Sequence, residues 1–471
     1  MSCRRRYLGR IPDGIARHGH DARSAGCRRV KQTLSIGLLA CRAPPPRYRA
    51  RPVFRILLPL TALLASVALL LGGNGLLGTL LAVRSQVEGW GERTTGLVMS
   101  GYFAGFFLGT FTAPPLIRRV GHIRAFAFHA ALAAAAVLVY PLWVEPVGWM
   151  LLRVVTGMAL VGLCTVIESW LNAQAAPEHR SRVFGVYMVV SLLALAAGQL
   201  LLDLQPPRSP VLFSVVAILF ALAILPVSAT RLTPPVMTVA PKVHLLQICR
   251  AAPSAAAGAL LAGLALGAFW GMGAVYAASL GLDRAGIGTF MAATIVGGAA
   301  LQLPIGRLSD RGDRRSTLAL VAACGAATAL VALRFDTQAH AGAHALFFLF
   351  GGLAFALYPL AVAHLLDRLP ADQLLAGCSA LLLLNGVGAA IGPAAAGVLM
   401  QAFGPVALPL FFAATLALLA LVAGGRRLFK AHRLLHPARF HPMLRTTPAA
   451  LEMLPEIPDA PEAAGHDPRG N

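Results

Sequence analysis

The chain has 471 residues, of which 57% are hydrophobic and only 13% charged, and its formal net charge is +21. A soluble domain carries about 25% charged residues, so the composition excludes an ordinary soluble protein and predicts one that crosses a membrane several times. The positive charge does not indicate a nucleic-acid partner, because Lys and Arg lie in short loops and tails between apolar runs.

In chain order, residues 1–51 come first; they are rich in Arg, and their one apolar run, "LSIGLLA", is too short to cross a bilayer. We expect them to form a basic, disordered cytoplasmic extension. Twelve apolar segments follow, and each predicts a helix because lipid offers the backbone no hydrogen-bond partner. Their expected limits are 56–83, 95–117, 124–144, 147–171, 183–203, 210–229, 254–280, 285–305, 316–334, 342–366, 374–400 and 405–424.

The loops after the even-numbered spans hold most of the Lys and Arg residues outside the tails. Loops rich in Lys and Arg stay in the cytoplasm, which predicts that both termini are cytoplasmic. The longest internal connection, 231–253, divides the spans six and six. The expected organisation is therefore a bundle at 52–230, a cytoplasmic loop at 231–253, a bundle at 254–425 and a disordered tail at 426–471.

The two halves share a layout. A small-residue patch is expected to interrupt the first span of each half, "LGGNGLLG" at 71–78 and "LGAFWGMG" at 266–273. The second span of each half leads into an Arg-rich turn, "LIRRVGHIR" at 116–124 and "GRLSDRGDRR" at 306–315. The fold class is thus an all-α membrane protein of twelve transmembrane helices in two pseudo-symmetric halves, an arrangement typical of secondary transporters.

Two motifs carry a family resemblance. The turn between spans 8 and 9 reads G-x-x-x-D-R-x-x-R-R, with Gly306, Asp310, Arg311, Arg314 and Arg315 at the defined positions, and "RVVTG" at 153–157 gives an Arg-x-x-x-Gly pattern in the fourth span. Over residues 52–425 the chain resembles the major facilitator superfamily. "GNGLLGTLLAVR", "LIRRVGHIRAF", "IESWLN" and "LNGVGAAIGP" resemble its YcaD-like branch of bacterial permeases, which implies a location in the inner membrane.

The resemblance implies that the turn at 306–315 is a conformational latch that favours the outward-facing state. Asp310 can pair with a neighbouring Arg, and the Arg residues can donate to carboxylates or helix C-terminal carbonyls. The corresponding turn of the first half contains Arg118, Arg119 and Gly121 but no Asp, so its copy of the latch would hold differently. The alternative is that these charges only set the topology.

Polar groups inside spans are costly and usually face the bundle interior. Counting about 1.5 Å per residue places three such groups near mid-bilayer and two nearer the outside. We expect them to line a transport path, although each could instead pack against a neighbouring helix. They are Asn74, Tyr102, Arg153, Trp270 and Asn385. Arg153 in particular could bind an anionic substrate group, tune a titrating carboxylate, form a structural pair or reach outward.

Two further groups are candidates for proton coupling. Glu168 is the only carboxylate well inside the first half, although an ion pair with the Arg residues of the cytoplasmic turns is the favoured interpretation. His364 could titrate near neutral pH, and a role at the helix end is equally consistent.

The sequence contains no G-x-x-x-x-G-K-[ST] loop and no H-E-x-x-H motif, so we expect neither an ATP-driven pump nor an enzyme. The seven cysteines form no CxxC pair and no zinc spacing, and no cofactor or metal is expected. The function favoured is a monomeric permease that moves a small solute by alternating access, with proton coupling open. An uncoupled facilitator, or a receptor or scaffold on a transporter fold, remains the alternative.

Overall fold

The computed structural model describes residues 60–175, 179–229, 245–334, 340–370, 373–425 and 443, all of which belong to one compact unit, Pro52–Asn471. All regular secondary structure in these residues is helical, and 12 helices are long and apolar enough to cross a membrane. The helices of the first half are α2 (Thr61–Val87), α3 (Glu92–Val120), α4 (His122–Val139), α5 (Pro146–Gln174), α6 (Arg180–Leu200), η3 (Leu201–Leu204), α7 (Val211–Leu222) and α8 (Ile224–Ser228). Those that follow are α9 (Leu245–Ala251), α10 (Pro253–Ser279), α11 (Arg284–Arg311), α12 (Arg314–Val331), η4 (Ala332–Arg334), α13 (His340–Leu366), α14 (Leu374–Phe403) and α15 (Ala407–Gly425).

Acidic side chains fix where several helices begin. The Glu145 carboxylate accepts from the backbone amides of Val147 and Gly148 at 3.1 and 2.7 Å, ahead of α5. Asp283 accepts from an amide of the first turn of α11, and Asp313 accepts from two amides of the first turn of α12. Each carboxylate accepts from amides that have no hydrogen-bond partner within the helix. Each also lies at the N-terminus of its helix, where the helix dipole is positive.

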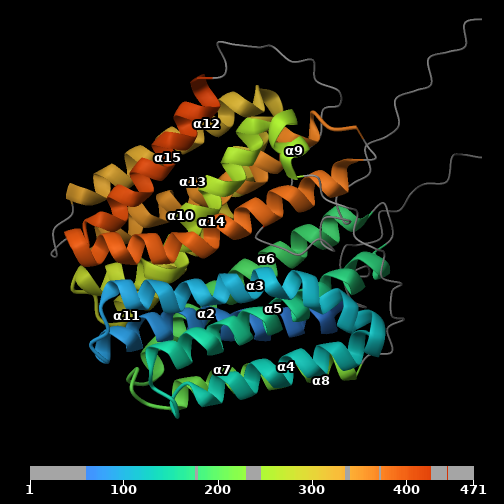
Figure 1. Cartoon of the computed structure of the whole chain (residues 1–471), viewed down its shortest axis with the longest axis vertical. Coiled ribbons are helices and arrows are strands. Elements are labelled where there is room, and N and C mark those ends of the chain that lie inside the picture. The colour runs from blue at the N-terminus through green and yellow to red at the C-terminus, as the bar shows by residue number, and fades with distance from the viewer. Residues whose placement is uncertain are drawn as a thin grey trace, which may run out of the picture. The chain divides into compact units, whose positions relative to one another are not determined.

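The same helix pairs pack together in both halves. In the first half α3 packs against α5, α2 against α6, and α4 against α7; the corresponding pairs of the second half are α11 with α13, α10 with α14, and α12 with α15. Figure 1 shows most helices of the second half above those of the first half, with α11 at the boundary between them. The six-plus-six repeat expected from the sequence is therefore present in the packing.

The small-residue patches do not interrupt their helices, contrary to the prediction from sequence. Helix α2 runs unbroken through 71–78 and α10 through 266–273. A Cβ on Gly75 would lie 2.6 Å from the Leu195 carbonyl oxygen of α6, and one on Gly267 would overlap the backbone of Ala389 in α14. The patches thus let the backbones of two helices approach closely.

Other boundaries differ from those expected. The sixth span is divided at Ala223 into α7 and α8, and the expected loop at 231–253 contains the helix α9 and the first residue of α10. The predicted extension at 1–51, the first part of that loop and, apart from Met443, the tail at 426–471 lie outside the described residues.

Candidate functional site: a cavity shared by the two halves

A cavity of about 150 Å³ lies where the two halves meet. Helices of the first half (α2, α3, α5 and α6) and of the second half (α10, α13 and α14) line it together. Five residues singled out by the sequence lie around this one cavity, namely Asn74, Tyr102, Arg153, Trp270 and Asn385.

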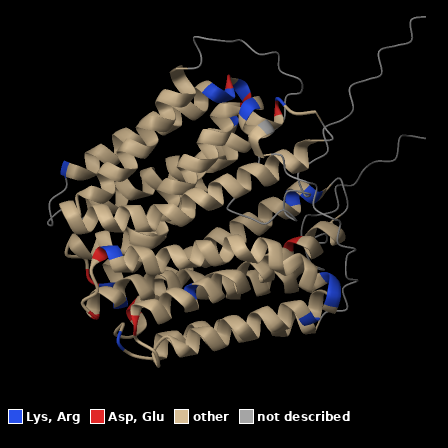
Figure 2. Ribbon diagram, in the orientation of Figure 1, with Lys and Arg blue, Asp and Glu red and all other residues tan. Residues whose placement is uncertain are grey.

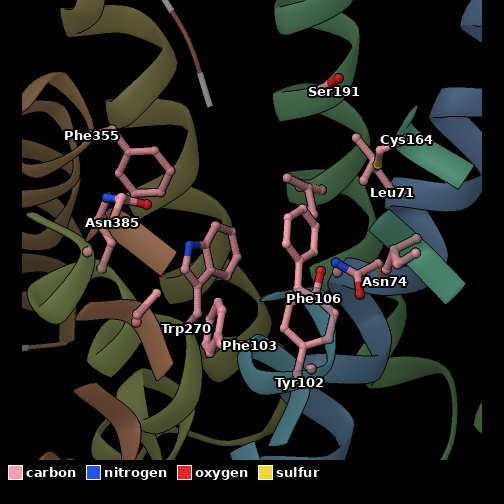
Figure 3. Close-up of a pocket in the computed structure, with 18 of the residues that line it drawn as sticks. Leu71, Asn74, Tyr102, Phe103, Phe106, Cys164, Ser191, Trp270, Phe355 and Asn385 are labelled. Atoms are coloured by element: carbon pink, nitrogen blue, oxygen red, sulfur yellow. The ribbon is translucent and has the colours of Figure 1, made fainter. Parts of the chain in front are cut away.

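Aromatic rings form two opposite walls of the cavity. Trp270 and Phe355 of the second half meet edge to face with 5.9 Å between ring centroids. Tyr102 and Phe103 of α3 do the same at 5.1 Å, and Phe106 follows one turn later. Figure 3 shows the Tyr102 and Phe106 rings facing Trp270 across the open space, with Phe103 beside Trp270. The walls therefore offer flat apolar surfaces to a solute.

Amide side chains link the cavity wall to neighbouring helices. The Asn385 amide nitrogen donates to the Ala259 carbonyl of α10 at 3.1 Å, and that of Gln199 donates to the Gly75 carbonyl of α2 at 3.1 Å. The Thr79 hydroxyl also contacts the Gln199 side-chain oxygen. These bonds orient the amides while leaving them on the cavity surface.

Arg153 of α5 is the charged group of the lining. Its side chain is 4% exposed, and its guanidinium carbon lies 4.7 Å from the centre of the Tyr102 ring. The Nε and Nη1 atoms have no hydrogen-bond partner among the described residues. A buried guanidinium normally has acceptors for its donors, so this one has free donor capacity.

Glu168 lies in α5 about four turns after Arg153, and its side chain is fully buried. The Tyr187 hydroxyl of α6 donates to its carboxylate at 2.7 Å, and Tyr187 also lines the cavity. Glu168 is therefore one side chain removed from the cavity surface.

The halves meet closely at the end of the molecule where α3 begins and α14 ends; we call the contact between residues 91–100 and 393–401 the seam. The Ala394 amide donates to the Ser100 hydroxyl at 3.1 Å, and the Arg93 amide to the Gln401 side-chain oxygen at 3.4 Å. A Cβ on Gly96 would overlap the Pro393 carbonyl. Helices α3 and α14 diverge away from the seam (Figure 1).

A second pair of helices joins the halves near the same end. The Arg284 guanidinium of α11 lies 3.7 Å from the Asp203 carboxylate of η3, and Gly288 packs against the backbone of Gln199. Figure 2 shows charged residues at the ends of the helices and very few along their middles.

The Arg-rich turn at 306–315 pairs with its own half. The Arg314 guanidinium lies 3.1 Å from Asp310 and 2.7 Å from Asp367, which follows α13. Arg315 donates to the Ala423 carbonyl of α15 at 2.7 Å, whereas Arg311 is exposed and Gly306 is buried. These contacts join α11, α12, α13 and α15 at the end opposite the seam.

The corresponding turn of the first half is more open. Gly121 joins α3 to α4 with a φ of +84°, a conformation that favours glycine. Arg118 and Arg119 are exposed at the end of α3.

His364 lies beside the turn at 306–315, outside the cavity lining. It is 2% exposed, and the Arg368 guanidinium approaches its Nδ1 atom at 2.7 Å. Its surroundings are those of a helix end packed against a charged turn.

Several residues of the cavity and of the turn escape prediction from sequence. Gln199, Tyr187 and Phe355 line the cavity, and Asp367 pairs with Arg314. Met443 also lines the cavity, where its carbonyl accepts from the Gln302 amide at 3.4 Å. Depth counting could have found Gln199 as a polar group within a span, but no local pattern connects Asp367 or Met443 with partners so distant in sequence.

The comparison with known families agrees with this architecture. The sequence profile of the Major Facilitator Superfamily matches residues 51–253 and 255–449. The chain belongs to the major facilitator superfamily.

An uncharacterized MFS-type transporter of Enterobacter sp. (strain 638) is 30% identical over 345 residues, which cover 73% of this chain and 89% of that protein. The uncharacterized MFS-type transporter YcaD of Salmonella newport (strain SL254) is 30% identical over 353 residues, which cover 74% and 89%. The resemblance to the YcaD-like branch is thereby confirmed.

Solved structures of other transporters share the fold. The nucleoside transporter NupG superposes with a TM-score of 0.68 at 14% identity, covering 79% of this chain and 99% of that chain. A bacterial homolog of the human lysosomal transporter Spinster, in an inward-facing and unoccupied conformation, gives a TM-score of 0.62 at 15% identity and covers 79% and 94%. At these identities the likeness concerns the fold alone, that of a multi-pass membrane transporter.

Proposed function

We propose that this superfamily member is a secondary transporter of the bacterial inner membrane, which carries a small solute through the shared cavity by alternating access. The observation that carries the proposal is the cavity itself, because both halves line it and the halves are in close contact at one of its ends. Rocking the halves about such a site would expose it to each side in turn.

The distribution of basic residues supports an orientation. The turns that contain Arg118 and Arg314 belong to the Arg-rich set, and such loops stay in the cytoplasm. Both termini are then cytoplasmic, and the seam lies at the outer face. In this orientation the described conformation is the inward-facing one.

The cavity residues take separate roles in this proposal. Trp270 and Tyr102 supply surfaces against which a solute packs, and Asn74 and Asn385 supply donors and acceptors that orient it. Arg153 supplies the one charged group of the described lining. The turn at 306–315 acts as the latch: in the outward-facing state it would contact the first half, and in the inward-facing state its charges pair within the second half.

Proton coupling, where it occurs, would use Glu168. Its carboxylate reaches the cavity through the Tyr187 hydroxyl, a route by which substrate binding can alter the environment of a proton site. His364 is a weaker candidate because it packs beside the charged turn.

Flux into proteoliposomes tests the proposal. The purified chain is reconstituted, and uptake of a solute panel is measured with and without a pH gradient, against empty vesicles and against the Trp270→Ala variant. We expect saturable uptake of at least one solute class and its loss in the variant. Uptake that does not respond to the pH gradient identifies a facilitator, and the absence of any protein-dependent flux would favour a receptor or scaffold.

A further inference from the structure

Arg153 is a buried cation whose charge the described part of the cavity does not balance. Among the described lining residues it is the only Lys, Arg, Asp or Glu. Along α5, the carboxylate of the cap residue Glu145 lies about 12 Å away and that of Glu168 about 22 Å away, at 1.5 Å per residue. Nε and Nη1 have no acceptor among the described residues, so no hydrogen bond from these two atoms explains the burial of the guanidinium.

A buried guanidinium in this condition is costly unless a ligand supplies the acceptors. Contact with the face of Tyr102 offsets part of the cost of burial but uses none of the N–H donors. A carboxylate fits the remaining need, because its two oxygens match the parallel donors of a guanidinium. Both nitrogens are covered in this conformation, and because the side chain lines the cavity, a rotation of the guanidinium would present them to an anionic group on the ligand.

The other lining residues determine the size and polarity of the rest of the ligand. Trp270 and Phe355 on one side and Tyr102 and Phe106 on the other leave apolar faces for a flat body (Figure 3). A cavity of about 150 Å³ restricts that body to a small molecule. A highly charged solute would be disfavoured, because the described lining holds a single cation to balance it.

We propose that the cavity binds a small organic monoanion, a carboxylate with an aromatic or apolar body, whose carboxylate pairs with Arg153 and whose body lies between the aromatic walls. The proposal rests on the function proposed above, in which the same cavity is the substrate site, and it adds the chemical class of the substrate.

Matched acids and amides test the chemistry. Benzoate and phenylacetate are titrated into the purified full-length protein, alongside benzamide and phenylacetamide, and binding is followed by quenching of tryptophan fluorescence. The Trp270→Phe variant identifies the cavity signal. We expect each carboxylate to bind at least tenfold more tightly than its amide. Equal affinities for acid and amide would overturn the proposal.

Variants of Arg153 separate binding from folding. Arg153→Met should weaken carboxylate binding about 10- to 100-fold and leave amide binding unchanged, whereas Arg153→Lys should retain part of the preference for the acid. Because Arg153→Met removes an unbalanced buried charge, the ligand-free variant should unfold at the same or a higher temperature than the wild type. A marked loss of thermal stability would show a structural role for Arg153 and overturn the proposal. Arg208→Met, at an exposed loop position, is the control and should bind both classes as the wild type does.

The two experiments can fail independently, so the proposed substrate class and the proposed transport function are tested separately. Protein-dependent flux of neutral or cationic solutes alone would support the transporter and reject the anion class. Arg153-dependent binding of carboxylates without flux of any solute would support the anion site and reject transport.

Discussion

The guanidinium of Arg314 lies between two carboxylates that differ in exposure. Asp367 is 5% exposed and Asp310 is 35% exposed. Removing one partner of a buried ion pair leaves an uncompensated charge and costs about 3–5 kcal/mol, whereas exposed pairs contribute about 1 kcal/mol or less.

We therefore expect Asp367→Asn to destabilise the protein by about 3 kcal/mol, near the lower limit for a buried pair because Asp310 remains. Asp310→Asn should cost about 1 kcal/mol or less. Chemical unfolding of the detergent-solubilised protein, followed by a thiol-reactive dye, measures both. An equal or larger loss for Asp310→Asn would contradict this ranking.

Asp313 gives a prediction for pH. Burial alone would raise the pKa of Asp313, but hydrogen bonds from the Ser316 hydroxyl at 2.6 Å, the Ser316 amide at 3.0 Å and the Arg315 amide hold it below its ordinary value. Since the folded pKa lies below the unfolded one, the carboxylate stabilises the fold above the unfolded pKa, near 3.8, and the contribution is lost as the pH falls through the folded pKa.

Asp313→Ala should accordingly lower the free energy of unfolding by about 1 kcal/mol at pH 7. The difference from the wild type should stay constant down to about pH 4 and narrow below it. The free energy of unfolding measured across this pH range checks the expectation. Ser316→Ala, which removes only the hydrogen bond from the Ser316 hydroxyl, should show a smaller effect with the same dependence on pH. A difference in the free energy of unfolding that grows at low pH would refute the claim that the pKa of Asp313 is lowered in the folded state.

Depth counting predicted at this scale which polar groups share a cavity, because a rigid helix converts sequence position into depth. Counting residues placed Asn74, Trp270 and Asn385, which lie on three helices, at similar depth, and all three line the cavity. Pairing between side chains distant in sequence could not be predicted in this way. The Asp367–Arg314 contact and the Tyr187–Glu168 contact depend on how whole helices are rotated, which hydropathy does not encode.

At the scale of helices, the seam depends on glycines at which two backbones touch. A Cβ on Gly96 would overlap the Pro393 carbonyl across the seam, whereas a Cβ on Gly105 would overlap Val154 within the first half. A Cβ on Gly185 would meet no atom within 4 Å.

Gly96→Ala should therefore separate α3 from α14 and shift the protein toward the form in which the seam is open. Gly105→Ala should lower stability without that shift, and Gly185→Ala should do neither. Accessibility of a cysteine placed at Ser100, measured with a membrane-impermeant thiol reagent, distinguishes the three variants. Labelling that is equally slow in Gly96→Ala and the wild type would disprove the role of the contact.

The small-residue patches show the limit of sequence interpretation at this scale. Clusters of glycine were expected to interrupt α2 and α10, yet both helices are continuous. The same composition allows a break or a close approach, and only the neighbouring helix, which covers Gly75 or Gly267, determines which occurs.

At the scale of the whole molecule, alternating access requires the seam to open during each cycle. Arg93 and Gln401 lie across it, with the Arg93 amide 3.4 Å from the Gln401 side chain. A disulfide between Arg93→Cys and Gln401→Cys, in a background without other cysteines, should reduce flux at least tenfold, and a reducing agent should restore it. Undiminished flux with the crosslink intact would show that transport does not need the seam to part.

The span count, the six-plus-six division and the family could all be predicted from sequence, because they depend on hydropathy and on a local motif. The contacts between the halves could not be predicted, since no local pattern in the sequence specifies a pair as distant as Ser100 and Ala394.

The glycine contacts of the seam also have an electrical consequence. Where backbone packs against backbone there is no room for a file of water, so in the proposed transporter the thin layer around Gly96 and Gly397 would insulate one compartment from the other. A membrane voltage falls mainly across the insulating part of its path, and each elementary charge moved through 100 mV changes energy by about 2.3 kcal/mol. The voltage would then act chiefly on the step in which a charged solute passes this layer, and hardly at all on its entry from the opposite side.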